Sequence, residues 1–290
     1  MRKGFTLLEM VFVIVIFGIL SKFGAELLFK IYENYIYSNT FNRLQNQSEA
    51  AVKQIANRLQ YRIRDSVISR NGTGGAAEPI GNSDATDEDV LEWVGIDIDG
   101  WKGINNTNPN WSGFIDIQAV RDSGSSTVLF SPGTQYNSTS GTGGGATTGA
   151  IFFVGSDVDL TGNFGWGGAI TDQTADMHPI KFNVAGNIES DILADPNFSG
   201  VRISEFYQFS TTAYAVHLDG TDLKLYYGYQ PWDGDNINTL ANRSESLIME
   251  GVTSFKFYAR GDIMIIQVCI GDNNVTGLGE YSACKEKVVF

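Results

Sequence analysis

The chain has 290 residues, a formal net charge of −13 at pH 7 and an isoelectric point near 4.5. A chain of this length can fold into one or two domains with a buried core. Its acidity argues against contact with nucleic-acid phosphates, which requires a local basic surface. One stretch is rich in arginine and contains Arg58, Arg62, Arg64 and Arg70. These arginines alternate with the apolar residues of a helix pattern, so we expect them to form a solvated flank of that helix or a contact with acidic neighbours instead of a nucleic-acid-binding surface.

An apolar segment begins close to the N-terminus. Between Phe5 and Leu20 only Thr6 and Glu9 interrupt the run of apolar residues. As a helix, this segment rises about 24 Å, which is a little short for a bilayer core, so apolar residues up to about position 29 are expected to complete the span. Positive charges on residues 2 and 3 predict a cytoplasmic N-terminus. The sequence therefore predicts a single-pass membrane helix over residues 5–29.

The residues that begin this segment distinguish two kinds of signal. A secretory signal peptide would carry a small-residue cleavage site after its apolar core, whereas here the helical pattern continues past Leu20. The order of a short basic leader, Gly4, Phe5, two leucines and Glu9 instead resembles the class III signal of type IV pilins and of the pseudopilins of type II secretion. The resemblance implies that a prepilin peptidase removes residues 1–4 by cleaving after Gly4, and that Phe5 becomes the methylated first residue.

Glu9 is the acidic residue inside the apolar segment. A carboxylate there is costly and should have a partner. The new α-amine of Phe5, supplied by a neighbouring subunit, is the expected partner in an assembled filament. The alternative is that Glu9 lies at the headgroup level and is merely solvated.

Helical character continues well beyond the membrane segment. Residues 30–70 form an amphipathic pattern with polar residues on the other face; the apolar stripe comprises Leu44, Ser48, Ala51, Val52, Ile55, Leu59, Ile63 and Val67. We expect one continuous helix over about residues 5–69. Its second half should pack on a sheet, because the heptads needed for the alternative, a coiled coil, do not hold between Tyr32 and Ser48.

The remainder of the chain, residues 71–290, is predicted to be a β-rich head. Residues 71–75 contain three glycines and end the helix. Short β-branched and aromatic runs then predict strands at residues 90–98, 114–120, 127–130, 151–154, 180–184, 201–209, 213–218, 223–229, 252–258, 263–270 and 288–290. Two glycine-rich stretches, 137–149 and 162–168, are expected to be flexible surface loops. Trp111 and Trp166 either contact a partner or carbohydrate from such loops or fill the core, and the core is favoured.

Cys269 and Cys284 are the two cysteines of the chain. A head that is exported to an oxidising compartment can keep them bonded, and a disulfide that closes a loop of this length stabilises a protein by about 3 kcal/mol. A zinc site at this pair is disfavoured because neither His178 nor His217 has ligand spacing to it. The sequence therefore predicts a disulfide.

Other candidate sites have weaker support. Residues 97–100 and 233–236 resemble fragments of calcium loops, but neither has the glutamate that completes such a loop, so ordinary Asp-Gly turns are favoured. Residues 272–276 match an acidic bacterial N-glycosylation sequon. No catalytic constellation stands out, so we predict no enzymatic activity, no catalytic residues and no cofactor.

A second, softer resemblance lies near the C-terminus. Residues 245–258, with Leu247, Gly251 and Val252, resemble a turn and strand of large minor pilins of the W type and of J-type pseudopilins. The large head also argues for a minor subunit. From these resemblances we expect an α+β protein that is a minor pilin or pseudopilin. It would first be held in the inner membrane with a periplasmic head. It would then be assembled with other pilin subunits into a periplasmic or extracellular filament. The machine served could be a pilus, DNA uptake (competence) or type II secretion, and the alternative function is a filament-borne adhesin.

Overall fold

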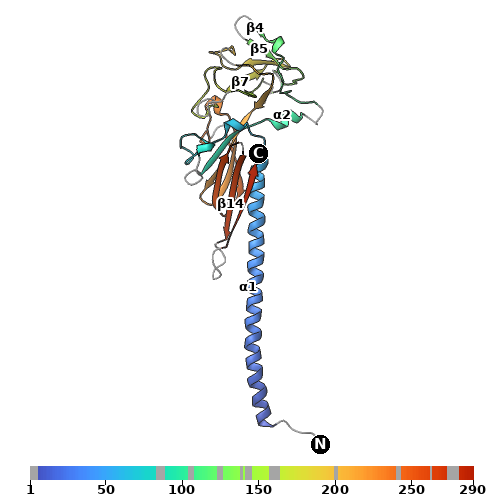
Figure 1. Ribbon diagram of the computed structural model, residues 1–290, viewed down its shortest axis with the longest axis vertical. Coiled ribbons are helices and arrows are strands. Elements are labelled where there is room, and N and C mark those ends of the chain that lie inside the picture. The colour runs from blue at the N-terminus through green and yellow to red at the C-terminus, as the bar shows by residue number, and fades with distance from the viewer. Residues whose placement is uncertain are drawn as a thin grey trace.

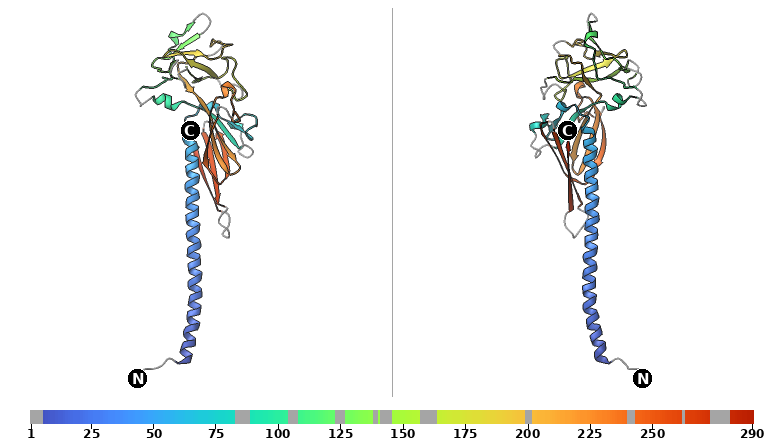
Figure 2. Two further views of the ribbon diagram at one scale, coloured as in Figure 1. Left: turned by 180° about the vertical axis from the view of Figure 1, so that it is seen from behind. Right: turned by 45° about the vertical axis from the view of Figure 1, so that its right-hand side comes forward.

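The computed structural model describes residues 6–82, 89–103, 108–122, 127–137, 140, 146–156, 164–198, 202–239, 243–261, 263–272 and 281–290. One helix, α1 (Leu7–Leu59), extends from the head like a stalk (Figure 1). Its 53 residues correspond to about 80 Å. The head packs against one side of the C-terminal part of the helix only, as the two further views show (Figure 2).

The buried stripe of α1 packs on a three-stranded antiparallel sheet. This sheet has the order β13 (Val252–Arg260), β14 (Ile263–Asp272), β15 (Tyr281–Val289). Alternate residues of β14, among them Ile266 and Val268, face the helix and meet Leu44, Ile55 and Leu59 in a first core. Apolar residues recur every three or four positions along α1, which places them on one side of the helix. They recur every second position along β14, which places them on one face of the sheet, so the two apolar surfaces pack together.

A six-stranded sheet closes this core from another side. Its order is β12 (Ser244–Met249), β11 (Asp222–Tyr229), β10 (Thr212–Asp219), β3 (Val90–Gly95), β1 (Ile68–Arg70), β2 (Glu78–Pro79). Leu91 and Trp93 of β3 point into the first core, whereas Val90 and Val94 point into a second core on the opposite face. Because both faces are covered, β3 is buried at every position.

The third sheet forms the end of the head farthest from the N-terminus (Figure 1). Its order is β4 (Arg121–Asp122), β5 (Thr127–Phe130), β8 (Asn187–Ser190), β7 (Met177–Phe182), β6 (Thr147–Phe153), β9 (Tyr207–Ser210). Phe153, Phe182 and Phe209 lie in its own core. One short helix, α2 (Ile98–Lys102), and the 3₁₀ turns η1 (Arg64–Ser66), η2 (Ile80–Asn82), η4 (Ile117–Ala119) and η6 (Pro231–Asp233) connect the strands. The predicted α+β architecture, a long N-terminal helix packed on antiparallel sheets, is confirmed.

The helix ends ten residues earlier than its apolar pattern indicated. After Leu59 the chain turns, and the Ile63 N–H donates to the carbonyl oxygen of Val94 at 2.9 Å. Ile68–Arg70 then pairs with β3 as strand β1. Ile63 and Val67 are buried as expected, but by the sheets instead of by a helix face. Tertiary hydrogen bonding to β3 therefore overrides the local helical pattern.

Other strand boundaries also differ from the predictions. The strand predicted at 114–120 is wrong: Phe114 makes an isolated bridge to Phe206, and η4 follows because the Asp116 carboxylate accepts the Gln118 N–H. Strand β6 begins at Thr147, inside the predicted loop 137–149. The C-terminal strand predicted at 288–290 is much longer, since β15 pairs with β14 along nine residues.

Candidate assembly site

The N-terminal half of α1 is not covered by the rest of the chain. Every residue from Thr6 to Tyr35 is exposed. This part includes an 18-residue window with a mean hydropathy of 2.2, none of it buried. By length and composition the helix can cross a membrane. A surface this apolar is unfavourable in water and requires lipid or other protein around it.

Glu9 lies in the first turn of α1, where the chain enters the helix. The backbone N–H of Thr6 donates to Glu9 Oε2 at 2.9 Å, and the Thr6 hydroxyl donates to the same oxygen at 3.0 Å. Thr6 is the residue before the helix, so its N–H is one that the helix itself leaves unpaired. The carboxylate thus stands at the positive end of the helix dipole. Its hydrogen-bond partner Thr6 directly follows Phe5, the expected first residue of a processed chain.

Four of the five charged residues in the exposed half of α1 share one side of the helix, and Glu9 is the exception. At about 100° per residue, Lys22, Glu26, Lys30 and Glu33 fall within a sector of about 80°. Among the buried residues that hold the head, Leu44, Ser48, Ala51 and Ile55 fall in the same sector, and Val52, Ala56 and Leu59 lie up to about 80° beyond it. The opposite side between Met10 and Leu28 carries no charged residue. The helix therefore turns these four charges to the head side and its uninterrupted apolar side away from the head.

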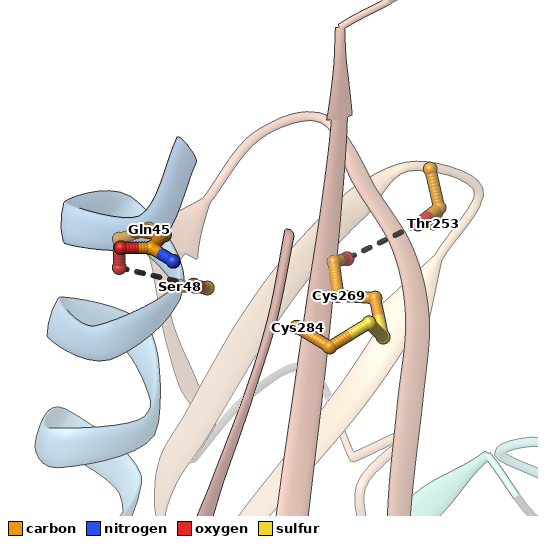
Figure 3. The surroundings of a disulfide bond; sticks show 5 residues. All are labelled: Gln45, Ser48, Thr253, Cys269 and Cys284. Atoms are coloured by element: carbon orange, nitrogen blue, oxygen red, sulfur yellow. Dashed lines mark hydrogen bonds between the residues drawn. A yellow bond between two sulfur atoms is a disulfide. The ribbon is translucent and has the colours of Figure 1, made fainter. Parts of the chain in front are cut away.

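A disulfide joins Cys269 of β14 to Cys284 of β15. The two residues are directly opposite each other in the antiparallel pair. Figure 3 shows the bond on the side of the sheet that faces away from α1, beside the hydrogen bond from Thr253 to the Cys269 carbonyl oxygen. The bond therefore crosslinks the two strands on which the helix packs.

The two tryptophans considered as partner contacts are core residues. Trp111 is 3% exposed and donates from Nε1 to the Asp97 carbonyl oxygen at 2.9 Å. Trp166 is 7% exposed and donates to the Ser66 carbonyl oxygen at 3.1 Å. The favoured interpretation, in which each ring fills a core, is confirmed.

The residues that resemble calcium-loop fragments serve local structure. Asp97 begins α2: its Oδ1 accepts the Gly100 N–H at 3.0 Å, and its Oδ2 accepts the Tyr136 hydroxyl at 2.9 Å. Asp233 lies in η6, and burial raises the pKa of its carboxyl, with Asp191 and Asp235 adding to the shift. Within the described ranges, no group of three or more His, Cys, Asp or Glu side chains could hold a metal ion.

The arginine-rich stretch does not form one surface. Arg70 is buried, and its Nε donates to Glu92 Oε1 at 2.9 Å. The Tyr229 hydroxyl donates to the other oxygen of Glu92 at 3.2 Å. Burial raises the pKa of the fully buried Glu92, while the Arg70 guanidinium opposes that shift. This triad was not predicted, although an acid in the middle of the apolar run 90–94 is the signal that could have found it.

Some predicted residues lie outside the part of the chain that the structure describes. Gly4 and Phe5 are among them, as are positions 141–145 of the 137–149 stretch and positions 273–276 of the sequon. Their assigned roles stay predictions.

Residues 1–21 match the model of the prokaryotic N-terminal methylation motif. This is the class III signal of the type IV pilin and pseudopilin family, so the chain is a prepilin-like protein. The motif implies processing by a prepilin peptidase, and with the apolar helix it indicates a membrane-anchored precursor. Proteins with this motif are generally non-enzymatic. No curated protein and no solved structure matches the chain.

Proposed function

We propose that the protein is a minor pilin or pseudopilin, a structural subunit of a type IV pilus or of a type II secretion-like filament. The observation that carries the proposal is the methylation motif at the start of a helix whose first half is apolar and uncovered. The large head on the other end of the helix suits a subunit that is used in few copies. Residues 1–4 are the leader, residues 5–29 the membrane and assembly segment, and the head is periplasmic before assembly.

Processing changes what the N-terminus can do. Cleavage after Gly4 removes Arg2 and Lys3, the charges that hold the N-terminus at the cytoplasmic surface, and creates an α-amine on Phe5. In the filament this amine, which the peptidase methylates, pairs with Glu9 of a neighbouring subunit. Such a pair offsets the cost of placing either charge in an apolar helix bundle. The Thr6 hydrogen bonds hold the Glu9 carboxylate near the end of the helix where a neighbour's N-terminus can reach it.

Substitution of Glu9 tests the proposal. Glu9→Leu should remain cleaved, membrane-bound and folded in its head, but should be lost from sheared or co-purified filaments by at least tenfold. Glu26→Leu is the matched control, because Glu26 is an exposed acid on the same helix but lies far from its N-terminal end. Normal recovery of Glu9→Leu in filaments would overturn the role of Glu9.

Substitution of Gly4 tests the processing step separately. Gly4→Val should accumulate as a precursor whose mass includes residues 1–4, whereas the wild-type protein should begin with N-methylated phenylalanine. A mature wild-type protein that begins at Met1 would contradict the proposal. Co-purification of tagged wild type with the other subunits then identifies the machine that it serves.

A further inference from the structure

A polar pocket of about 320 Å³ opens on the head where three segments meet. The segments are residues 73–75, residues 165–168, and residues 234–236 with Asn238. Six of the lining residues are glycines, which have no side chain, so peptide groups form much of the wall. The volume is at the lower end of the range for small-molecule sites, about 300–1,000 Å³, which is enough for one small ring.

Hydrogen bonds join the three segments that form the walls of the pocket. Arg70 donates from Nη1 to the Gly75 carbonyl oxygen at 2.9 Å and from Nη2 to the Trp166 carbonyl oxygen at 3.2 Å. Its Nε is held by Glu92. Asn238 Nδ2 donates to the Thr73 carbonyl oxygen at 2.9 Å and joins the third segment to the first. A site whose walls are tied in this way needs little ordering when a ligand binds.

The lining selects the class of ligand. Asn236 Oδ1 accepts the Asn238 N–H, and Asn238 Nδ2 donates to the Thr73 carbonyl oxygen. The remaining hydrogen-bonding positions of these two amides, the Thr73 hydroxyl and peptide groups of the glycine segments supply both donors and acceptors, which is what a molecule rich in hydroxyl groups requires. An anion is disfavoured by the charge of −13 and by the Asp235 carboxylate in the wall. The Arg70 charge is already compensated by Glu92.

The pocket is also placed away from the helix. Its Trp166 belongs to the second core, on the face of the six-stranded sheet opposite to the core that contains α1. Packing of α1 against other helices therefore leaves the pocket open.

We infer that this pocket binds a neutral sugar unit. The inference adds ligand binding to the proposed function. It rests on the proposed function in one respect, namely that the head is exposed outside the inner membrane. The sugar is either free or the terminal unit of a glycan.

The test uses the full chain in a detergent without a sugar headgroup. Saturation-transfer NMR and calorimetry measure binding of glucose, galactose, mannose and N-acetylglucosamine, of oligosaccharides that end in them, and of cationic glucosamine and anionic glucuronate. We expect binding of at least one neutral sugar and much weaker binding of both charged ones. Stronger binding of an oligosaccharide than of its terminal sugar would identify a glycan as the source.

Gly167→Leu is the pocket-filling variant. Gly167 lines the pocket, and a Cβ there would meet nothing within 4 Å, so a leucine can be added to the pocket wall without displacing backbone. It should weaken sugar binding at least tenfold. Gly81→Leu is the matched control, because Gly81 is equally open but lies outside the pocket, and its binding should equal that of wild type. Both variants should keep the wild-type unfolding temperature and enter filaments normally.

Thr73→Val is a second variant, which removes one hydroxyl at nearly constant shape and should weaken binding several-fold even if Gly167→Leu folds poorly. Absence of binding by any neutral sugar, preference for a charged ligand, or unchanged binding by both pocket variants would overturn the inference. Because filament entry of these variants is measured separately, such a result leaves the assembly role of Glu9 untouched.

Discussion

Arg70 and Glu92 form a charge pair in the interior of the head: Arg70 Nε lies 2.9 Å from Glu92 Oε1, with both side chains buried. The pair joins neighbouring strands β1 and β3 and, through the other nitrogens of Arg70, two glycine-rich segments. A buried charge is tolerated only while its partner and hydrogen bonds are in place.

Removal of the positive partner should therefore be strongly destabilising. Arg70→Met leaves the Glu92 carboxyl buried without its counter-charge, and we expect a loss of about 3–5 kcal/mol in the free energy of unfolding. Chemical denaturation of the full chain measures it. Lys53→Met, which breaks the exposed pair with Glu49 on α1, should cost less than about 1 kcal/mol. Equal losses in the two variants would contradict the interior role of the pair.

The double variant Arg70→Met with Glu92→Leu sharpens this result. Because it removes both charges, it should recover a large part of the stability that Arg70→Met loses. A double variant that is less stable than Arg70→Met would show that the contacts of Arg70 with the glycine-rich segments, and not the charge, dominate.

His178 should make stability fall in mild acid. Burial lowers the pKa of this imidazole to about 4, and it is held against Gln173 Oε1 at 3.1 Å. The unfolded chain binds a proton below about pH 6.5 and the folded chain does not, so stability is lost as the pH falls from about 6.5 to about 4. Between pH 7 and pH 5 we expect a loss of about 2 kcal/mol from this residue.

The variant His178→Gln isolates that contribution. It should show a smaller decrease in unfolding free energy between pH 7 and pH 5 than the wild type, whatever its stability at pH 7. Identical pH slopes in the two proteins would mean that His178 titrates normally in the folded state.

The disulfide should stabilise the sheet that carries the helix. Cys269 and Cys284 are 15 residues apart, and the chain-entropy model assigns a loop of that size about 3 kcal/mol. The double variant Cys269→Ala with Cys284→Ala should lose a comparable amount, measured by denaturation. In the wild type, labelling with a thiol reagent should require a reductant; labelling of the native protein without one would contradict the bond.

Core truncation should separate the two halves of α1. Ile55 is fully buried against the sheets, whereas Ile14 is exposed. Ile55→Ala should destabilise the head by about 2–5 kcal/mol. Ile14→Ala should leave head unfolding unchanged, because its side chain contacts no part of the head. A shift in head unfolding on truncation of Ile14 would show that the two halves are coupled.

The N-terminal features could be read from the sequence because they are local. The leader, Gly4, Phe5 and Glu9 lie within one short stretch of sequence. The apolar segment that follows them forms a single helix, so its character depends on neighbouring residues alone. The stripe from Leu44 to Leu59 was likewise predictable, since helical spacing alone places those residues on one side. The two cysteines predicted a bond, and its strands are the ones that pack on α1.

Contacts between distant segments decided the rest. Ile63 and Val67 continue the helical spacing, yet hydrogen bonds to β3 end the helix at Leu59, and no local pattern encodes that competition. The pairing of Arg70 with Glu92, the burial of Trp166 and the pocket where glycines from three segments meet exist only once the sheets have assembled. A periodic run fixes which side of its own element is apolar, but which partner covers that side depends on the energy of the whole packed arrangement.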